Sequence, residues 1–408
     1  MKKLICLLLT VMLSLGALRV CGEDADGNEN DISAETNAEM MPETVFTPAS
    51  GSPYEGQDET LNYWTLPMDI TDEAAVWEVL MQPITVLDRG KGYSEKSQIV
   101  VRSEPDSKSA GVGTVTCITQ GVHVLEKGEE WTKIECYSSS FHDSPILNWN
   151  RLVQGYVPTS YLRTTVPNQK YGLVIDKLTQ RLYLFVNGKL FSTLLVSTGL
   201  SNAKQPYNET RSGEFLLTSA VGTFKSDNLR CGYALRFNDG DLLHEVPYTL
   251  MRDGKGKDYK KCEAKLGTKA SHGCIRVQRK KTPEGINMYW LWENRVKNTK
   301  MLVWEDWQGR QITVPPDDMP LYADDGNEGT YHSQDHCYAD SKRTEPYASF
   351  TYAELDTEPY AALTRCQYCA PALRKAEIEA INEIYAPGGD HDPVLTEALK
   401  TCPRKLKK

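Results

Sequence analysis

The chain has 408 residues, a length that suggests two or three domains, and its 40% hydrophobic and 25% charged residues are typical of ordinary globular protein. The formal net charge of −9 gives no support for nucleic-acid binding. No basic stripe interleaved with aromatic residues occurs in the sequence, so nucleic acid is not an expected partner.

The N-terminus has the features of an export signal at residues 1–22. Lys2 and Lys3 precede a mostly apolar run of 15 residues, which is shorter than the roughly 20 that a membrane-spanning helix needs. The following "LRVCG" allows either cleavage after Gly22 or lipidation of Cys21 as the first mature residue. We therefore expect an exported protein of the cell envelope, either secreted or held by a membrane lipid anchor at Cys21.

Residues 23–60 are acidic, rich in Asp, Glu, Asn, Gly and Ser, and without periodicity. That composition is typical of a disordered linker. A short helical pattern, "DEAAVWEVL", follows within residues 61–81 and leads into the next domain.

From residue 83 to about residue 165, short β-rich runs separated by Gly, Pro or charged turns predict a small barrel. This part, taken with its lead-in helix as a domain at 61–166, resembles bacterial SH3-like domains in "VVRSEPDSKS", "GEEWTKIE" and "GYVPTSYL". The resemblance implies binding to the cell wall or positioning of an attached enzyme, with a ligand-free spacer as the alternative. Cys117 and Cys136 lie on adjacent predicted strands and either pair or serve as small core residues.

A larger, mostly β domain is expected at residues 170–307. "RLYLFV" and "KLFSTLLVS" flank "NGK", which predicts a β-hairpin, and "GEFLLTSA" and "MLVWEDW" predict further strands. "TPEGINMYWLWENRVKN" has the apolar spacing of one helix, with Thr282 expected as the N-cap and Pro283 at the first helical position. The expected fold is therefore a mainly β multi-domain protein with one helix flanking this sheet.

The stretch "KASHGCIRVQ" places Cys274 directly after Ser271, His272 and Gly273. A thiol attacks as the thiolate, and an unperturbed pKa of about 8.5 leaves only a few per cent ionised at neutral pH, so a nucleophile needs a nearby base. His272 is two residues away and His244 is 30 residues away in sequence, and spacing alone does not decide between them.

The residues around the thiol suggest an acyl substrate that carries acid groups. Gly273 lacks a Cβ and lets a substrate or a turn approach the backbone, where the amides of Gly273 and Cys274 are placed to face a developing oxyanion. Arg276 is always charged and suits a carboxylate.

"SHGCIRV" resembles the motif of the L,D-transpeptidase catalytic domain, and "VIDKLTQRLYLFVNGK", "VSTG", "RSGEF" and "LGTKASHGCIR" agree with it. The resemblance implies a mixed β-sheet, Cys274 as nucleophile and His244 as general base. It also implies that the motif residues beside the nucleophile shape the site and that Arg276 binds substrate. Two features depart from the family pattern: the charged insertion "RDGKGKDYKKCEAK" and Glu245 in place of glycine after the histidine.

The implied reaction joins peptidoglycan stem peptides and requires no metal or organic cofactor. Cys274 forms a thioester with a stem tetrapeptide and releases the terminal D-alanine, and the side-chain amine of a diamino acid resolves the thioester to a 3→3 cross-link. Water in place of the amine gives an L,D-carboxypeptidase. A catalytically inactive cell-wall-binding protein is the alternative from another class.

Cys231 and Cys262 flank His244 in sequence. They either form a disulfide that fixes a lid over the cleft or remain two independent thiols. A disulfide closing this 31-residue loop would restrain the unfolded chain by about 3 kcal/mol or more.

After a linker expected at residues 308–329, residues 330–408 are expected to form a small Cys/His module that ends in a helix and a basic tail. "YHSQDHC" and "CQYC" offer a Cys3His site in which Cys337, Cys366 and Cys369 join His332 or His336, and CxxC pairs suit tetrahedral zinc. A resemblance to small Cys/His motifs of bacterial extracellular proteins favours His332. Disulfides that include Cys402, or a redox CxxC, are the alternatives.

Overall fold

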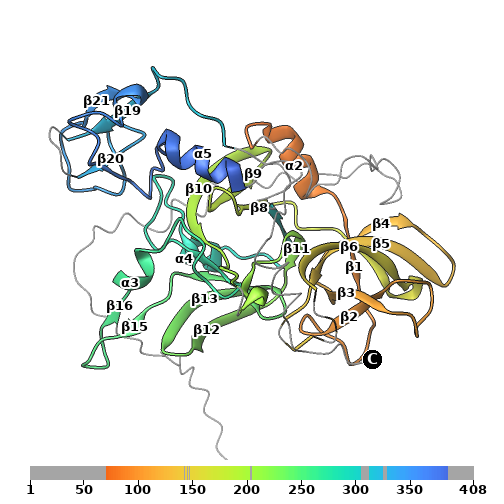
Figure 1. Cartoon of the computed structure of the whole chain (residues 1–408). Coiled ribbons are helices and arrows are strands. Elements are labelled where there is room, and N and C mark those ends of the chain that lie inside the picture. Colours follow the sequence, from red (N-terminus) through yellow and green to blue (C-terminus); the bar gives the residue numbers. More distant parts are fainter. Residues whose placement is uncertain are drawn as a thin grey trace, which may run out of the picture. The chain divides into compact units, whose positions relative to one another are not determined.

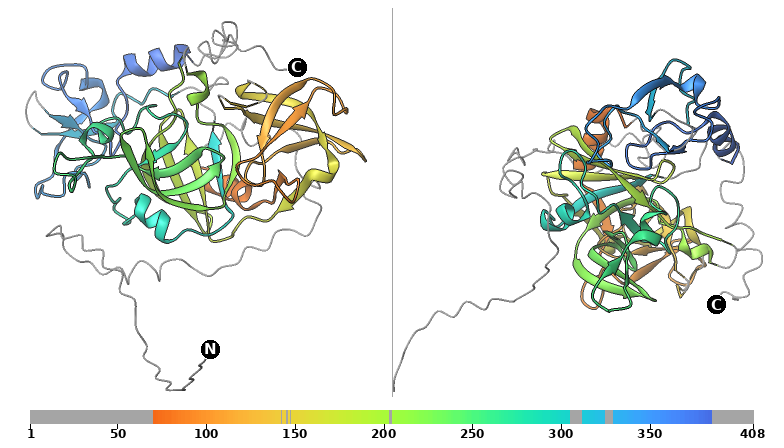
Figure 2. Two further views of the ribbon diagram at one scale, coloured as in Figure 1. Left: turned by 90° about the horizontal axis from the view of Figure 1, so that it is seen from below. Right: turned by 90° about the vertical axis from the view of Figure 1, so that its left-hand side faces the viewer.

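The computed structural model describes residues 70–141, 143–144, 146, 148–202, 205–304, 312–324 and 329–384 (Figures 1 and 2). The predicted export segment with Cys21, the acidic linker at 23–60 and Cys402 lie outside the described residues. None of the helices within these ranges combines the length and apolar character needed to cross a membrane.

The first described element is helix α2 (Glu73–Met81), which confirms the helical pattern before the barrel. The Asp72 carboxylate accepts a hydrogen bond from the backbone N–H of Ala75 at 3.2 Å and so caps the helix N-terminus. Its buried residues Val76 and Leu80 pack with apolar side chains of the large sheet.

An antiparallel five-stranded sheet in the order β3-β2-β6-β5-β4 follows. Its strands are β2 (Gln98–Arg102), β3 (Gly111–Thr116), β4 (His123–Glu126), β5 (Trp131–Ser139) and β6 (Trp149–Pro158), and β1 (Ile84–Leu87) pairs with β7 (Leu162–Thr165) after the short helix η1 (Thr159–Tyr161). Cys117 and Cys136 are free thiols in its apolar core, so they are core residues and not a disulfide. The strands confirm a small β domain, while its resemblance to SH3-like domains stays a prediction.

The main domain is built on a mixed sheet of nine strands in the order β11-β18-β8-β9-β10-β17-β14-β13-β12. The pairs β8–β18 and β14–β17 are parallel and the other pairs are antiparallel. In chain order the strands are β8 (Tyr171–Asp176), β9 (Arg181–Val186), β10 (Lys189–Ser197), β11 (Gly213–Leu217), β12 (Ala220–Ser226), β13 (Leu229–Asn238), β14 (Asp241–Glu245), β17 (Ile275–Val277) and β18 (Thr299–Trp304), with the short helix η2 (Pro206–Asn208) before β11.

The sequence of the central strands explains their place in this sheet. Strands β8 and β18 read "YGLVID" and "TKMLVW", and every residue of both is buried. Such continuous burial is typical of strands that are covered on both faces. The predicted hairpin between β9 and β10 is confirmed, because Asn187 and Gly188 both adopt positive φ, at 51° and 75°, as a tight hairpin turn requires.

The helix after the nucleophile motif begins later than predicted. Helix α4 spans Met288–Glu293, and its N-cap is Asn287, whose side chain accepts from the Trp290 N–H at 2.9 Å. Thr282 and Pro283 belong instead to a turn, in which the Gly285 N–H donates to the Thr282 carbonyl. Gly285 has a φ of 81°, which a right-handed helix does not allow, so the N-cap prediction at Thr282 is wrong.

The charged insertion after His244 is ordered and carries its own elements. Strand β15 (Thr249–Leu250) pairs with β16 (Lys257–Asp258), and helix α3 (Lys260–Glu263) follows. Cys262 of α3 is buried with Leu195, Val246 and Leu266, which anchors the insertion to the sheet.

The C-terminal module contains two small strand pairs. Strand β19 (Pro320–Ala323) pairs antiparallel with β21 (Ala348–Thr351), and β20 (Thr330–Tyr331) pairs parallel with β22 (Thr364–Arg365). The short helix η3 (Tyr352–Glu354) and helix α5 (Lys375–Ile384) complete it. Strand β19 lies within the linker expected at 308–329 and pairs with β21. The module therefore begins earlier in the chain than the expected residue 330.

Candidate active site

The parallel pairing of β14 with β17 brings the predicted base and nucleophile to one region of the sheet. His244 is paired with Arg276 and Leu243 with Ile275, so Cys274, which directly precedes β17, lies alongside Leu242. Paired residues of neighbouring strands and residues two apart along a strand face the same side. The side chains on one face of these two strands therefore include His244, Arg276 and Leu242. Cys274 lies directly before β17, alongside Leu242.

His244 is buried, and its ring has a defined tautomer. Its Nδ1 lies 2.6 Å from the backbone carbonyl oxygen of Glu245. Because a carbonyl only accepts, Nδ1 carries the proton and Nε2 is left as a proton acceptor. The Phe224 ring stands edge-on at a centroid distance of 5.4 Å and fixes the plane of the imidazole.

The surroundings keep His244 neutral. Burial, together with a smaller effect of the Arg276 charge, lowers the pKa of His244 to about 4, while the hydrogen bond to the Glu245 carbonyl acts in the opposite direction. At neutral pH the imidazole is therefore unprotonated and able to accept a proton.

Cys274 is half-buried, and its Sγ lies 3.8 Å from the Gly240 carbonyl oxygen. Burial and the neighbouring Asp241 carboxyl raise the pKa of Cys274 to about 12, and the Leu242 backbone N–H and Arg276 lower it by less. At rest the site thus holds a neutral thiol and a neutral imidazole, and a thiol in this state becomes a nucleophile only when it loses its proton.

The loop that carries the nucleophile is held by hydrogen bonds from both sides. Ser271 is buried, and its hydroxyl donates to the Cys274 carbonyl oxygen at 2.5 Å. The Gly273 carbonyl accepts from the Thr210 hydroxyl at 2.8 Å. The Gly273 N–H donates to the Ser271 hydroxyl at 3.3 Å, so this amide, expected to face an oxyanion, is engaged within the loop.

Gly273 occupies a position that no other residue fits. Its φ is 120°, and a Cβ built on it would lie 2.2 Å from Oδ1 of Asp241. This backbone geometry departs from an extended strand, so the rule that residues two apart face the same side does not apply to His272 and Cys274. His272 is exposed and forms no hydrogen bond or ion pair within the described ranges. Of the two candidate bases, His244 is therefore the buried one and His272 the exposed one.

A buried ion pair that sequence reasoning missed lies beneath Gly273. Arg211 Nη1 is 3.1 Å from Asp241 Oδ2, and both side chains are almost completely buried. Arg211 Nη2 donates to the Ser140 carbonyl at 2.7 Å, and its guanidinium lies 3.8 Å above the Phe141 ring. Burial raises the pKa of Asp241 to about 6 although Arg211 opposes the shift. The available signal was Arg211 itself, an arginine two residues before the buried strand β11.

A second buried charge cluster supports the same segment. Lys177 Nζ lies 2.6 Å from Glu209 Oε1 and donates to the Thr210 carbonyl at 2.9 Å. Lys269, at the start of the nucleophile motif, reaches Glu209 at 3.3 Å. Glu209 thus forms ion pairs with both lysines and links the nucleophile motif to the end of β8.

Arg276 is half-buried and, within the described residues, has no ion-pair or hydrogen-bond partner. Its charge acts on both His244 and Cys274. A cation with no protein counterion beside the thiol suits an incoming carboxylate. Glu245 is instead turned to the charged insertion, where it accepts a hydrogen bond from the Tyr259 hydroxyl at 3.1 Å.

Cys231 and Cys262 are both buried and both free, so the disulfide alternative for this pair is wrong. Burial raises the pKa of Cys231 to about 12, which leaves it a protonated thiol. In the C-terminal module, the four predicted ligands His332, Cys337, Cys366 and Cys369 come together with all ligand atoms within 4.8 Å of one another. His336, the other candidate ligand, is exposed and contacts Asp335.

Residues 170–303 match the family model of the L,D-transpeptidase catalytic domain. The Bacillus subtilis protein YciB, which is named as an L,D-transpeptidase, is 35% identical over 132 residues, which are 30% of this chain and 60% of YciB. The chain thus spans less than two thirds of this relative.

Solved structures of L,D-transpeptidases show lower similarity. The enzyme from Stackebrandtia nassauensis is 20% identical with a TM-score of 0.24, and the match covers 33% of this chain and 56% of that one. L,D-transpeptidase 3 from Mycobacterium tuberculosis, solved with a faropenem-derived adduct, is 15% identical with a TM-score of 0.26, and the match covers 53% of this chain and 100% of that one.

Proposed function

We propose that the chain is a peptidoglycan L,D-transpeptidase in which Cys274 is the nucleophile and His244 the general base. The register of β14 and β17, which pairs His244 with Arg276 two residues after Cys274, is the observation that supports this most. The Nδ1–H of His244 is committed to the Glu245 carbonyl, so Nε2 is the nitrogen left to accept the thiol proton.

The first half-reaction forms a thioester. The Cys274 sulfur attacks the carbonyl carbon of the third residue of a stem tetrapeptide while its proton passes to Nε2 of His244. The bond to the terminal D-alanine breaks, and that amine leaves with the proton from His244. Arg276 binds a carboxylate of the stem, and the hydrogen bonds of Ser271 and Thr210 hold the nucleophile loop in place.

The second half-reaction transfers the acyl group. The side-chain amine of a diamino acid on another stem loses a proton to His244 and attacks the thioester carbonyl. The carbon–sulfur bond breaks, the thiol regains its proton, and a 3→3 amide cross-link is formed. When water attacks instead, the product is a free tripeptide and the enzyme is an L,D-carboxypeptidase.

We further propose that this chemistry takes place in the cell envelope and that the N-terminal β domain positions the catalytic domain toward the wall. Several backbone and side-chain hydrogen bonds join the two domains. The Gly121 N–H donates to the Glu214 carbonyl at 2.9 Å, the Leu216 N–H to the Thr119 carbonyl at 2.8 Å, and the Ser139 hydroxyl to Asn238 Oδ1 at 3.1 Å. These contacts favour a fixed arrangement of the two domains over a flexible connection between them.

The test is intact mass spectrometry of the chain after mixing with purified tetrapeptide-containing muropeptides. We compare the wild type with Cys274→Ala and with Cys262→Ala, a buried thiol outside the active site. The expected result is an acyl adduct and a cross-linked dimer lacking one D-alanine in the wild type and in Cys262→Ala, with neither in Cys274→Ala. Tripeptide without dimer would establish carboxypeptidase activity. A folded wild type that forms no adduct would support the alternative of an inactive wall-binding protein.

A further inference from the structure

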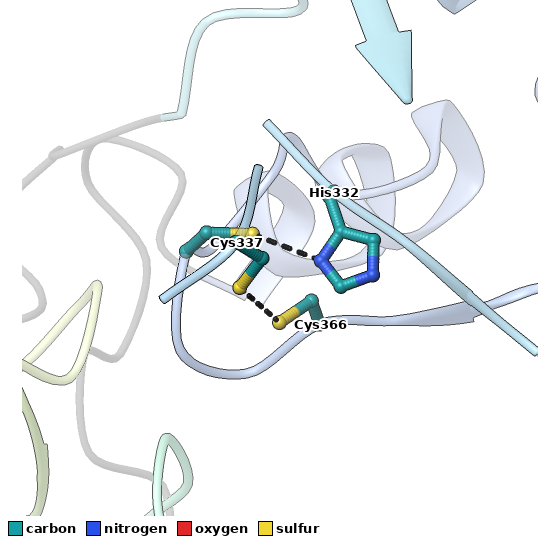
Figure 3. A group of neighbouring side chains, drawn as sticks. His332, Cys337 and Cys366 are labelled. Carbon is teal, nitrogen blue, oxygen red and sulfur yellow. Dashed lines mark hydrogen bonds between the residues drawn. The ribbon is translucent and has the colours of Figure 1, made fainter. Parts of the chain in front are cut away.

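The C-terminal module places four potential metal ligands on adjacent backbone segments. The parallel register of β20 with β22 pairs Tyr331 with Arg365, so the next residues, His332 and Cys366, lie side by side. The Cys366 N–H donates to the Tyr331 carbonyl at 3.0 Å, and the His332 N–H to the Tyr322 carbonyl at 2.7 Å. Figure 3 shows the side chains of His332, Cys337 and Cys366 pointing toward one another.

The spacing of the ligand atoms matches a metal tetrahedron and not a disulfide. The Sγ atoms of Cys337 and Cys366 are 3.7 Å apart, and Sγ of Cys369 is 3.5 Å from Nδ1 of His332. Bonds of about 2.3 Å to sulfur and about 2.0–2.1 Å to nitrogen give tetrahedral edges of about 3.8 Å and about 3.6 Å. A disulfide would instead require sulfur atoms about 2.05 Å apart.

The groups around the four ligands hold them in this arrangement. Backbone N–H groups of Ser333 and Ala339 donate to the sulfur atoms of Cys369 and Cys337, each at 3.4 Å. The His332 ring is stacked on Tyr347 with centroids 4.2 Å apart. Amide hydrogen bonds to sulfur and a fixed histidine ring are the outer-shell support that metal ligands require.

We propose that His332, Cys337, Cys366 and Cys369 bind one structural Zn²⁺ ion. Three thiolates and one imidazole nitrogen are a soft donor set that suits zinc and not magnesium or calcium. Four protein ligands complete the tetrahedral shell and leave no position for a substrate, so the ion is structural. His332, Cys337 and Cys366 are only 4–6% exposed, which agrees with a closed site.

The ion also stabilises the contact between the module and the catalytic domain. The Arg181 guanidinium donates to the carbonyl of Gln367, inside the CxxC turn, at 3.2 Å. Lys280 Nζ donates to the Ala339 carbonyl at 2.6 Å, two residues after Cys337. Both acceptors are backbone oxygens whose positions depend on the turns that the metal holds, so loss of zinc is expected to release the module from this surface.

The experiment measures the zinc content of the purified full chain by inductively coupled plasma mass spectrometry. Two histidine variants form the matched pair: His332→Ala removes a proposed ligand, and His336→Ala removes the exposed histidine of the same segment. We expect about one zinc per chain in the wild type and in His336→Ala, and at least a tenfold loss in His332→Ala after dialysis against a weak chelator.

A second measurement does not depend on the folding of a variant. Wild-type chain reconstituted with Co²⁺ is expected to show the intense visible absorption of tetrahedral cobalt and a sulfur-to-cobalt charge-transfer band. Metal retained equally by His332→Ala and the wild type would overturn the proposal. So would a metal-free wild type whose mass, before and after reduction, shows a disulfide among Cys337, Cys366 and Cys369.

Discussion

The chain uses cysteine and histidine together in two places, and the surroundings give the two groups opposite properties. At the active site, burial raises the pKa of Cys274 to about 12 and lowers that of His244 to about 4. In the C-terminal module, burial lowers the pKa of His332 but hydrogen bonds from Cys337 and Cys366 outweigh it, and the pKa is raised to about 9. Hydrogen bonds among the neighbouring thiols lower the pKa of Cys366 and raise that of Cys369.

The opposite pKa shifts of the two histidines show that the neighbours of a histidine, and not its residue type, decide which form is favoured. Several thiols that converge on one histidine stabilise a thiolate and a charged ring, or a metal in its place. The half-buried Cys274 thiol, whose pKa is raised to about 12, stays protonated at neutral pH. The active site therefore depends on the protein scaffold to hold its loop, whereas the module depends on its own sulfur atoms.

The largest effect is expected from the scaffold beneath the nucleophile. Arg211→Met leaves the Asp241 carboxyl buried without a counterion, and breaking a buried pair in this way costs about 3–5 kcal/mol. Urea unfolding measures the loss of the free energy of unfolding. Arg211→Met combined with Asp241→Asn is expected to recover part of it, because no charge then remains buried.

The control for this variant is Lys189→Met. It breaks the surface ion pair between Lys189 and Glu73, whose N–O distance is similar to that of the Arg211–Asp241 pair. Lys189 is 76% exposed in its side chain, so the expected change is within about 1 kcal/mol. If Arg211→Met is no more destabilising than Lys189→Met, the buried pair does not support the catalytic loop.

Gly273→Ala tests the loop itself. The added Cβ would meet the Asp241 carboxylate at 2.2 Å and would sit on a backbone with a φ of 120°, so the loop must move. A displacement of about 1 Å at a nucleophile costs about 100-fold in rate, and we expect that loss in acyl-adduct formation with the zinc content unchanged.

Gly232→Ala is the matched control, because its Cβ would meet only Glu245 Oε2, at 4.0 Å. It is expected to keep the wild-type rate within about threefold, since an ordinary contact displaces nothing. Equal rates in the two variants would show that the nucleophile loop tolerates a side chain at residue 273 and that its conformation is not required.

Sequence patterns predicted the features that depend on neighbouring residues. The "NGK" hairpin follows from the turn preference of two adjacent residues, and the helix before the barrel follows from its own apolar spacing. The convergence of the four proposed zinc ligands was predicted because CxxC is a short pattern with a direct chemical meaning. The start of α4 was missed because a proline and a threonine suggested an earlier cap than the one that Asn287 provides.

Features that depend on distant segments were not predictable in this way. Arg211 and Asp241 are 30 residues apart, and the Ser140 carbonyl that binds Arg211 lies 71 residues before it. Nothing in the local pattern of any of these three residues indicates the other two. A buried pair of opposite charges is visible only once the sheet and the N-terminal domain are packed together, so the polar support of the nucleophile loop came from the structure alone.

The smallest expected effect concerns the resting state of the nucleophile. A pKa near 12 leaves a thiolate fraction of roughly 10⁻⁵ at pH 7, against roughly 3% for an unperturbed cysteine with a pKa of about 8.5. Iodoacetamide is therefore expected to alkylate Cys274 at least tenfold more slowly than a free cysteine peptide at pH 7. The rate should keep rising with pH beyond 9, because deprotonation continues until the pH approaches the thiol pKa.

Peptide mass mapping, with Cys274→Ala as the reference, assigns the alkylation to this thiol. A rate that is already at its plateau near pH 7 would instead mean that a thiolate and an imidazolium are paired at rest. In that case proton transfer would precede substrate binding, and His244 would hold its charge despite its burial. Slow alkylation together with rapid acylation by a stem peptide would mean that the proton moves to His244 during the attack itself. The thiol would then lose its proton only when it reacts with the carbonyl of the bound substrate.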